Sequence, residues 1–584
     1  MGIPVKSDTE DLSAEAKWTR REINWLACVS LGFGALFSYP MLVNLRDVSV
    51  QYDWDFESEL HWVAYYTVAH FHQFPIWNPY KCGGMGMLAN PQSRFLTPFF
   101  LLHLLLGPSV GAHLEVILHL SICWAGCYVL ARELGMRPVA AAVAGTAFSA
   151  SSWFPLHIGE GHLVMLPFAY LPWFLVLMML AVKTGKWTPS VVAGALFAIT
   201  FGEGGVLIFI YASPLIALFA MYLCLQLRSS RPMTFLAAAG IFGATLSAVK
   251  LLPSYELVVL HPRQPWGFAF STWSNIAEIL FSHDQARHAE GDRFFVEFGT
   301  YVSPTFWLLG IVGIVFFRKR IVPWVLAAGL MLWLVRGDNA VVPLWTYLKA
   351  LPLYSMMRIP SRFFIVLAFC IALIAASGAD EIQHRMRRRG QILVAVLLGI
   401  GALDSFVVGT PFLRHAFDRK GPDLPYSTAF RQFDDVYPLD MTLVARADMG
   451  FVSCYEYTRW ITNVLGWNDP GYKGEQYMEG PGSARLLYWT PNVLRYEVET
   501  PAESIMKINQ NYDAAWRLVR GRGRLFSDGG LLAVEVPPGR QAIELVCRGT
   551  AFVVGAFISL AALLVGVSIC LAEWRGSRTS RGRT

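Results

Sequence analysis

The sequence predicts a polytopic α-helical membrane protein with about twelve transmembrane helices and a β-rich domain outside the bilayer. Three observations lead to this fold class. Long apolar runs recur along the chain, so that 54% of the 584 residues are hydrophobic and only 15% are charged. Basic residues gather in the short loops between these runs. One long segment near the C-terminus instead regains charges and turn-forming residues.

The polar N-terminal segment, residues 1–23, is expected to lie in the cytoplasm. The apolar run that follows it, residues 25–45, is too long for the core of a signal peptide and has no small-residue cleavage site. This run therefore predicts an uncleaved signal anchor, which is the first span of a transmembrane domain over residues 24–409.

The other spans are predicted from further apolar runs, several of them so short that their ends must be buried in protein. One additional run, residues 95–106, contains Pro98 and predicts a re-entrant or interfacial helix. The runs expected to span the membrane are residues 24–44, 110–131, 139–154, 163–182, 188–203, 206–227, 233–251, 301–317, 321–335, 361–379, 391–409 and 551–572.

The distribution of charge predicts the topology, because cytoplasmic loops of membrane proteins carry an excess of lysine and arginine. If the N-terminus is cytoplasmic, the even-numbered turns and the tail 573–584 are cytoplasmic too, and all of them are basic. Both termini are therefore expected on the cytoplasmic side of a bacterial inner membrane, with the first external loop, residues 46–109, on the other side. The net charge of +6 comes from these loops. Because the positive-inside pattern explains these basic residues, they do not indicate nucleic acid as a partner.

Residues 410–550 are expected to form the extracytoplasmic β-rich domain, tethered by the last transmembrane helix over 551–572. Short strand-like runs alternate there with Gly and Pro turns, at residues 441–447, 494–498, 531–536 and 542–546. The nine cysteines show no metal-ligand spacing, so they do not signal a metal site. No cofactor is predicted, and participation of a divalent cation stays open. Cys454 and Cys547 both fall in this domain and could form a disulfide; the alternative is two free thiols.

Two carboxylates, Asp53 and Asp55, stand a few residues beyond the first span. In an extended segment this spacing would place both on one side, where one could orient a substrate and the other act as general base. The alternative is a solvated acidic turn that caps a helix beginning near Phe56. The same loop then becomes dense in proline, glycine and amides, which predicts an irregular backbone that lines a cavity or an ordered loop without a ligand. Its candidate cavity residues are Trp77, Asn78, Asn90 and Gln92.

Further polar residues fall at other external turns. His157, Glu160 and His162 share one short loop, where they line a cavity, hold a metal ion or simply make the loop polar. Glu203 lies at the end of a span, where an acid is costly unless it has a function. On the cationic side, Arg358 and Arg362 are four residues apart before a span. With Arg263 they suggest an anion such as a lipid phosphate; the alternative is snorkelling to ordinary headgroups.

With these segments the sequence resembles the YfhO-like bacterial membrane proteins of the GT-C superfamily of integral-membrane glycosyltransferases. The resemblance extends over nearly the whole chain. It is carried by Asp53-Trp54-Asp55, by residues 74–80 and 88–93, by Gly161-His162, by residues 357–362 and by residues 511–516 and 531–538.

The resemblance implies a GT-C-like fold and a sugar transferred from a polyprenyl-phosphate donor to a glycan or glycolipid acceptor of the cell envelope. Asp53 or Asp55 would be the general base of a single inverting displacement, and Arg263, Arg358 or Arg362 would hold the leaving phosphate. Two other functions stay open: a transporter or flippase for lipid or polysaccharide, and a non-catalytic scaffold for envelope assembly.

Overall fold

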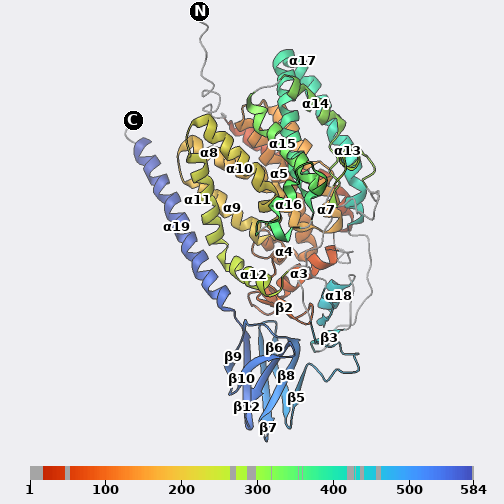
Figure 1. Ribbon diagram of the computed structural model, residues 1–584, viewed down its shortest axis with the longest axis vertical. Helices are drawn as coiled ribbons and strands as arrows, with labels where there is room; N and C mark the ends of the chain where they lie inside the picture. Colours follow the sequence, from red (N-terminus) through yellow and green to blue (C-terminus); the bar gives the residue numbers. More distant parts are fainter. Residues whose placement is uncertain are drawn as a thin grey trace, which may run out of the picture.

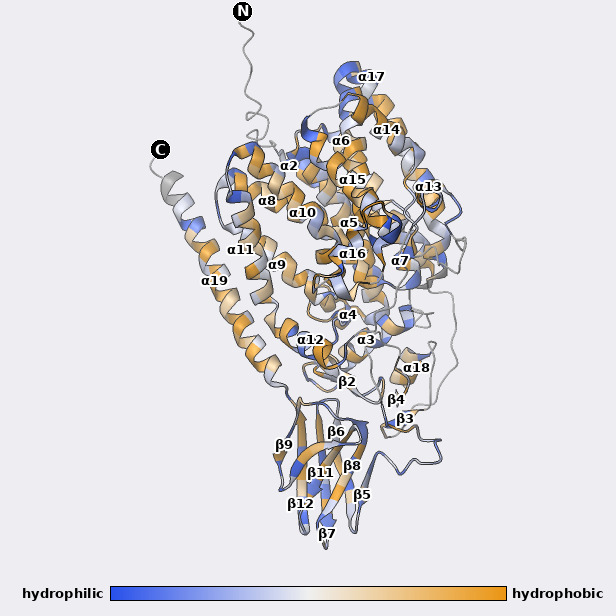
Figure 2. Ribbon diagram, in the orientation of Figure 1, coloured by the Kyte–Doolittle hydropathy of each residue, from blue (hydrophilic) through white to orange (hydrophobic). Residues whose placement is uncertain are grey.

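The computed structural model describes residues 18–45, 53–262, 271–285, 297–316, 319–352, 354–357, 359–416, 427, 429–433, 440–454 and 462–581. A bundle of helices forms the larger body, and a β-sandwich lies at one end of it (Figure 1). Apolar residues dominate the helices of the bundle, whereas the strands mix apolar and polar residues (Figure 2). This arrangement confirms a polytopic helical membrane protein with a β-rich domain.

Among the described residues every predicted apolar run overlaps a helix, but the prediction of twelve spans is not confirmed. Seven helical stretches are long and apolar enough to cross a membrane, or eight if the pair α11 and α12, bent by 78°, forms one span. Some of the other helices are too short to cross the membrane. The 12 residues of α14, for example, rise only ~18 Å, whereas the hydrocarbon core is ~30 Å thick. The helices that correspond to the runs are α2 (Arg20–Ser38), α5 (Pro108–Glu133), α6 (Pro138–Ser149), α8 (Leu171–Thr184), α9 (Thr188–Gly202), α10 (Val206–Leu227), α11 (Arg231–Leu246), α12 (Ala248–Leu260), α14 (Pro304–Val315), α15 (Val322–Val335), α17 (Phe364–His415) and α19 (Thr550–Arg581).

The 52-residue α17 is a helical hairpin, which accounts for two of the predicted runs. Arg387 has non-helical dihedral angles (φ 53°, ψ −126°) that reverse the chain. After the reversal Gly390 packs on the carbonyl of Ile382, so closely that a Cβ would lie 2.4 Å from that oxygen. The hairpin turn lies at the end of the bundle far from the sandwich (Figure 1).

The β-sandwich consists of two four-stranded sheets with the orders β10-β11-β8-β5 and β6-β7-β12-β9. Alternate residues of β7 are buried, as expected for a strand with one face in a core. The facing sides bury Trp516, Val498 and Leu545. The strands are β5 (Gln476–Glu479), β6 (Ser483–Thr490), β7 (Val493–Thr500), β8 (Ser504–Asn511), β9 (Trp516–Arg520), β10 (Arg524–Asp528), β11 (Leu531–Val536) and β12 (Gly539–Cys547).

The segment before the sandwich packs on the first external loop instead. Residues 441–447, expected as a strand, contain the helix α18 (Met441–Arg446), which contacts α3 (Asp53–Ala69). Beside it β3 (Arg431–Phe433) pairs in parallel with β4 (Met449–Phe451). The expected pairing of Cys454 with Cys547 is wrong: Cys454 forms a disulfide with Cys82, and Cys547 is a buried free thiol.

The first external loop is held between the bundle and the sandwich. After α3 it forms the two-residue strands β1 (Trp77–Asn78) and β2 (Met85–Gly86) and the short helix α4 (Phe100–Leu106). With seven residues, α4 cannot span a bilayer, in agreement with the interfacial or re-entrant prediction. Asn511 of the sandwich donates hydrogen bonds to the carbonyls of Cys82 and Gly84, at 2.6 and 2.9 Å, and thereby fixes the loop to β8.

Candidate functional site

Asp53 lies in the first turn of α3 and faces His162, whose Nε2 donates a hydrogen bond to Oδ2 of Asp53 at 2.8 Å. Both side chains line a small cavity, whose empty space is about 260 Å³ when the open solvent at its mouth is counted. The first external loop and the turn after α7 (Trp153–Glu160) form its wall. The lining residues are Asp53, Phe56, Glu57, Gln92, Gly161, His162 and Val164.

Gly161 makes this approach possible. It ends α7 in the left-handed conformation (φ 87°), and a Cβ there would lie 2.2 Å from the backbone nitrogen of Trp54. Only glycine has no side-chain carbon at this position. The indole of Trp54 also donates a hydrogen bond to the carbonyl of Ile158 at 2.6 Å, so a second contact joins α3 to α7.

The charge of His162 is set by its acidic neighbours. Burial disfavours the imidazolium, but the hydrogen bond and negative charge of Asp53, together with Glu297, outweigh burial and raise the pKa of His162 to about 9. His162 is therefore cationic at neutral pH. Its Nδ1 lies 2.8 Å from Nδ1 of His157, which can accept the second imidazolium proton. The imidazole rings of His157 and His162 together hold the carboxylate of Asp53 in its orientation toward the cavity.

Asp55 points elsewhere. Because α3 already begins at Asp53, both Asp53 and Asp55 lie on a helix. Their side chains are separated by ~200° around the helix axis and do not share a side. The carboxylate of Asp55 instead accepts hydrogen bonds from the backbone nitrogens of Met441 and Thr442, at 2.7 and 3.0 Å. It caps the N-terminus of α18, and its side chain is buried, which raises its pKa.

A second acid shares the cavity with Asp53. Glu57 follows it by one helical turn and is 2% exposed. Burial is the largest influence on Glu57 and raises its pKa to about 8. Glu57 is four residues after Asp53. In a helix that begins at Asp53, this spacing predicts that the two acids lie on the same face.

Near the cavity lies a buried network of charges, of which only Glu203 was predicted as a site residue. Arg94 forms an ion pair with Glu115, and its guanidinium also donates to the carbonyls of Leu163 and Glu203. The carboxylate of Glu203 faces His119 at 3.0 Å. Tyr170 and Thr97 also donate hydrogen bonds to Glu203, both at 2.9 Å. An acid inside an apolar run is costly, so Glu115 within residues 110–131 was a signal for this network.

Among the described residues, two triads have side-chain donors close enough to hold a metal ion. The first is His61, His103 and Glu115, and the second is Glu115, His119 and Glu203. In the first, the imidazoles are stacked at 4.4 Å and 19°, so their nitrogen lone pairs run side by side rather than converging. In the second, Arg94 already neutralises Glu115 and His119 pairs with Glu203. The second triad is thus held by ion pairs, whereas in the first triad Nε2 of His61 and Nδ1 of His103 are buried without a hydrogen-bond partner among the described residues.

Most of the other loop candidates hold the backbone in place. Asn78 is fully buried and donates to Glu59 at 2.8 Å, and Asn90 accepts a hydrogen bond from the backbone of Gln92 at 2.9 Å. Trp77 is fully buried and packs edge-on against Trp516. Gln92 alone of these four lines the cavity with Asp53.

The remaining candidates lie around His162. Glu160 ends α7 and is half-buried, and His157 is buried behind His162. Arg362 forms a two-pronged ion pair with Glu297, with contacts of 3.1 and 3.2 Å. Arg263 and Arg358 lie outside the described residues.

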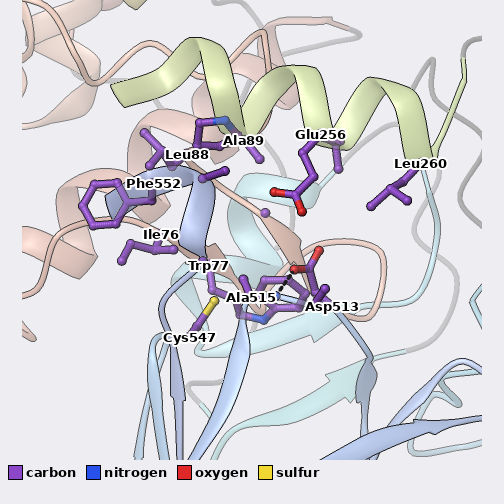
Figure 3. Close-up of a pocket in the computed structure, with 16 residues that line it drawn as sticks. Ile76, Trp77, Leu88, Ala89, Glu256, Leu260, Asp513, Ala515, Cys547 and Phe552 are labelled. Atoms are coloured by element: carbon purple, nitrogen blue, oxygen red, sulfur yellow. Dashed lines mark hydrogen bonds between the residues drawn. The ribbon is translucent and has the colours of Figure 1, made fainter. Parts of the chain in front are cut away.

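A second cavity lies where α12 and the start of α19 meet the sandwich, and its empty space is about 530 Å³ when the open solvent at its mouth is counted. Glu256 of α12 and Asp513 of the β8–β9 turn point toward each other across it, above Trp77 and Cys547 (Figure 3). Burial raises the pKa of Asp513, which accepts a hydrogen bond from the backbone of Ala515 at 2.7 Å. The described lining residues of this cavity include these two acids and no cation.

The chain matches no protein-family model and no curated protein sequence. Two structures of the arabinofuranosyltransferase AftD from Mycobacteria are similar to it, at 16% identity and TM-scores of 0.43 and 0.41. They cover 68% and 70% of this chain, which spans 28% of theirs. The oligosaccharyltransferase of Archaeoglobus fulgidus is similar at 12% identity and a TM-score of 0.43, with 74% of this chain and 64% of that chain covered. The YfhO-like resemblance stays a prediction.

Proposed function

We propose that this protein is an integral-membrane glycosyltransferase that moves a sugar from a polyprenyl-phosphate donor to a cell-envelope acceptor. The observation that carries the proposal is the contact between Asp53 and His162, at 2.8 Å in the wall of a cavity. A carboxylate fixed in orientation by an imidazolium is suited to accept a proton from a hydroxyl group.

In the proposed reaction Asp53 takes the proton of the acceptor hydroxyl as its oxygen attacks the anomeric carbon. The bond from this carbon to the phosphate oxygen breaks, and polyprenyl phosphate leaves with the electron pair. A single displacement of this kind inverts the configuration. Asp55 has no part in it, because its carboxylate caps α18.

The leaving phosphate requires positive charge. His162 lines the cavity, and Arg362 lies near enough for its charge to lower the pKa of His162. We propose that His162 and Arg362 stabilise the charge that develops on the phosphate, as fixed cations do in other transferase sites. Arg263 and Arg358 are proposed as further phosphate ligands on the sequence argument alone.

The proposed side of the membrane is extracytoplasmic, with both termini in the cytoplasm. The disulfide between Cys82 and Cys454 supports this orientation, since disulfides persist in oxidising compartments. The disulfide joins the first external loop, which also supplies Asp53, to the segment that follows β4. Nucleotide sugars are cytosolic, so a lipid-linked sugar is the donor available on that side.

The test is sugar transfer in membranes that contain wild-type protein, Asp53→Asn or Glu503→Asn, supplied with a panel of labelled polyprenyl-phosphate sugars. Glu503 lies on an exposed turn of the sandwich and serves as the control. We expect transfer to fall by about 10²–10⁴-fold in Asp53→Asn only. Undiminished transfer by Asp53→Asn would remove the proposed base. Absence of transfer by the wild type with every donor would favour the transporter or scaffold alternatives.

A further inference from the structure

The cavity wall contains an acid that the reaction above does not use. Glu57 lies one turn after Asp53 on α3, and both side chains line the same cavity. The Oε2 atom of Glu57 is buried and has no hydrogen-bond partner among the residues that the structure describes. A polar atom buried without a partner costs free energy, so its position in a cavity wall points to a ligand.

Burial also decides which form of this acid is present. An ionised carboxylate without solvent or hydrogen bonds is unstable, so a buried acid keeps its proton. For Glu57, burial is the largest influence; Arg94 and Lys81 partly offset it, and Asp53 and Glu115 add to it. With a pKa of about 8, Glu57 is neutral at neutral pH and offers an O–H donor to the cavity.

We infer that Glu57 is a phosphate-recognition residue whose carboxylic acid donates a hydrogen bond to a phosphate oxygen of the polyprenyl-phosphate group. The inference rests on the proposed function for the identity of the ligand. An ionised carboxylate at this place would repel the phosphate, whereas a neutral acid attracts it. Asp53 and Glu57 thus have opposite roles on one helix face: the first accepts a proton and the second donates a hydrogen bond.

The protons and electrons of the reaction remain balanced with this role. The acceptor proton goes to Asp53, and the electron pair of the broken bond goes to the phosphate oxygen. A phosphate monoester has a second pKa of about 6, which lies below that of Glu57. Glu57 therefore keeps its proton and donates a hydrogen bond that strengthens as charge develops on the oxygen.

The experiment measures binding of a short-chain polyprenyl phosphate to the full-length protein in nanodiscs of neutral lipid, from pH 6.5 to 9. His162 titrates at about 9 and lines the same cavity, so the measured quantity is the ratio of the affinities of wild type and Glu57→Gln. Glutamine keeps a hydrogen-bond donor but does not titrate. We expect the ratio to fall up to about tenfold between pH 7 and pH 9, because one pH unit above the pKa leaves about a tenth of the acid protonated.

Two further variants complete the design. Glu57→Ala removes the donor and is expected to bind about tenfold more weakly at pH 7. Glu503→Gln, on an exposed turn, is expected to bind as the wild type does at every pH. In the wild type, addition of the polyprenyl phosphate should shift the infrared carbonyl band of a protonated carboxylic acid. This measurement uses only the wild type and therefore does not depend on whether a variant folds.

A ratio that does not change with pH, equal binding by Glu57→Ala, or an unshifted carbonyl band would each overturn the role of Glu57. The binding results are independent of sugar transfer. A wild type that binds the lipid phosphate with the expected pH dependence but transfers no sugar would contradict the proposed function and leave Glu57 as a phosphate-recognition residue.

Discussion

Lys250, on α12, donates hydrogen bonds from its buried ammonium to the carbonyl of Ser93 at 2.5 Å. The same ammonium reaches the carbonyls of Pro91 and Phe201, each at 3.2 Å. One side chain thus joins the bent helix pair, the first external loop and the end of α9. Gln92, between the two loop carbonyls, lines the cavity with Asp53.

The first prediction concerns this junction. Lys250→Met keeps most of the side-chain volume but leaves buried carbonyls without a donor, at a cost of about 1–3 kcal/mol for each group that water cannot reach. We expect a lower melting temperature of the detergent-solubilised protein and reduced sugar transfer, because the loop that carries Gln92 loses its support. A variant that melts and transfers like the wild type would show that the loop is held without Lys250.

Gly161→Ala should separate His162 from Asp53. The new Cβ would lie 2.2 Å from the backbone of Trp54, and the left-handed backbone adds strain. The turn must therefore move away from α3, and we expect loss of transfer with the disulfide retained. Gly185→Ala, at another left-handed helix end with open space around it, tests the backbone strain alone. Equal loss in both variants would argue against a specific effect on His162.

Asp55→Ala is predicted to affect stability rather than chemistry. It removes the cap of α18, and such a loss costs about 0.5–2 kcal/mol. We expect earlier proteolysis of the segment around α18, measured by limited digestion, while the remaining folded protein transfers sugar. If Asp55→Ala abolishes transfer without change in stability, the assignment of the base to Asp53 fails.

The ion pair of His162 with Asp53 predicts a dependence of stability on pH. The folded-state pKa of His162, about 9, lies above the ordinary histidine value of 6.5. The stabilisation is therefore fully present below about pH 6.5 and is lost as the pH rises through about 9. Its size is on the order of 3 kcal/mol. Melting temperatures from pH 6 to 10 should fall more steeply for the wild type than for His162→Gln; parallel curves would contradict the pair.

The disulfide predicts a pattern of labelling. Peptide mapping of unreduced protein should find Cys82 linked to Cys454, and Cys547 should react with maleimide only after unfolding because it is buried. Cys82→Ser is expected to lower stability by about 2–4 kcal/mol, and Cys547→Ser should leave the link intact. A link between Cys454 and Cys547 would contradict the structure.

The sequence by itself determined the membrane class, the position of the apolar helices and the β-rich domain, but not the extent of α3, which contains Asp53. These features follow from local signals, because an apolar run or an alternating strand is recognised from residues that are close together in the sequence. It also placed Asp53, Gln92 and His162 among the candidates. Their types, an acid, an amide and an imidazole outside the apolar runs, were the available signal.

Only the tertiary structure decided between Asp53 and Asp55, because that choice depends on where α3 begins and on α18, almost 400 residues further along the chain. It also decided that Cys454 pairs with Cys82, 372 residues away, and that Arg94 and Glu115 form a buried pair. The physical reason is the same in each case. Hydrogen bonds, ion pairs and disulfides form between groups that the fold brings together, and spacing along the sequence does not fix such distances.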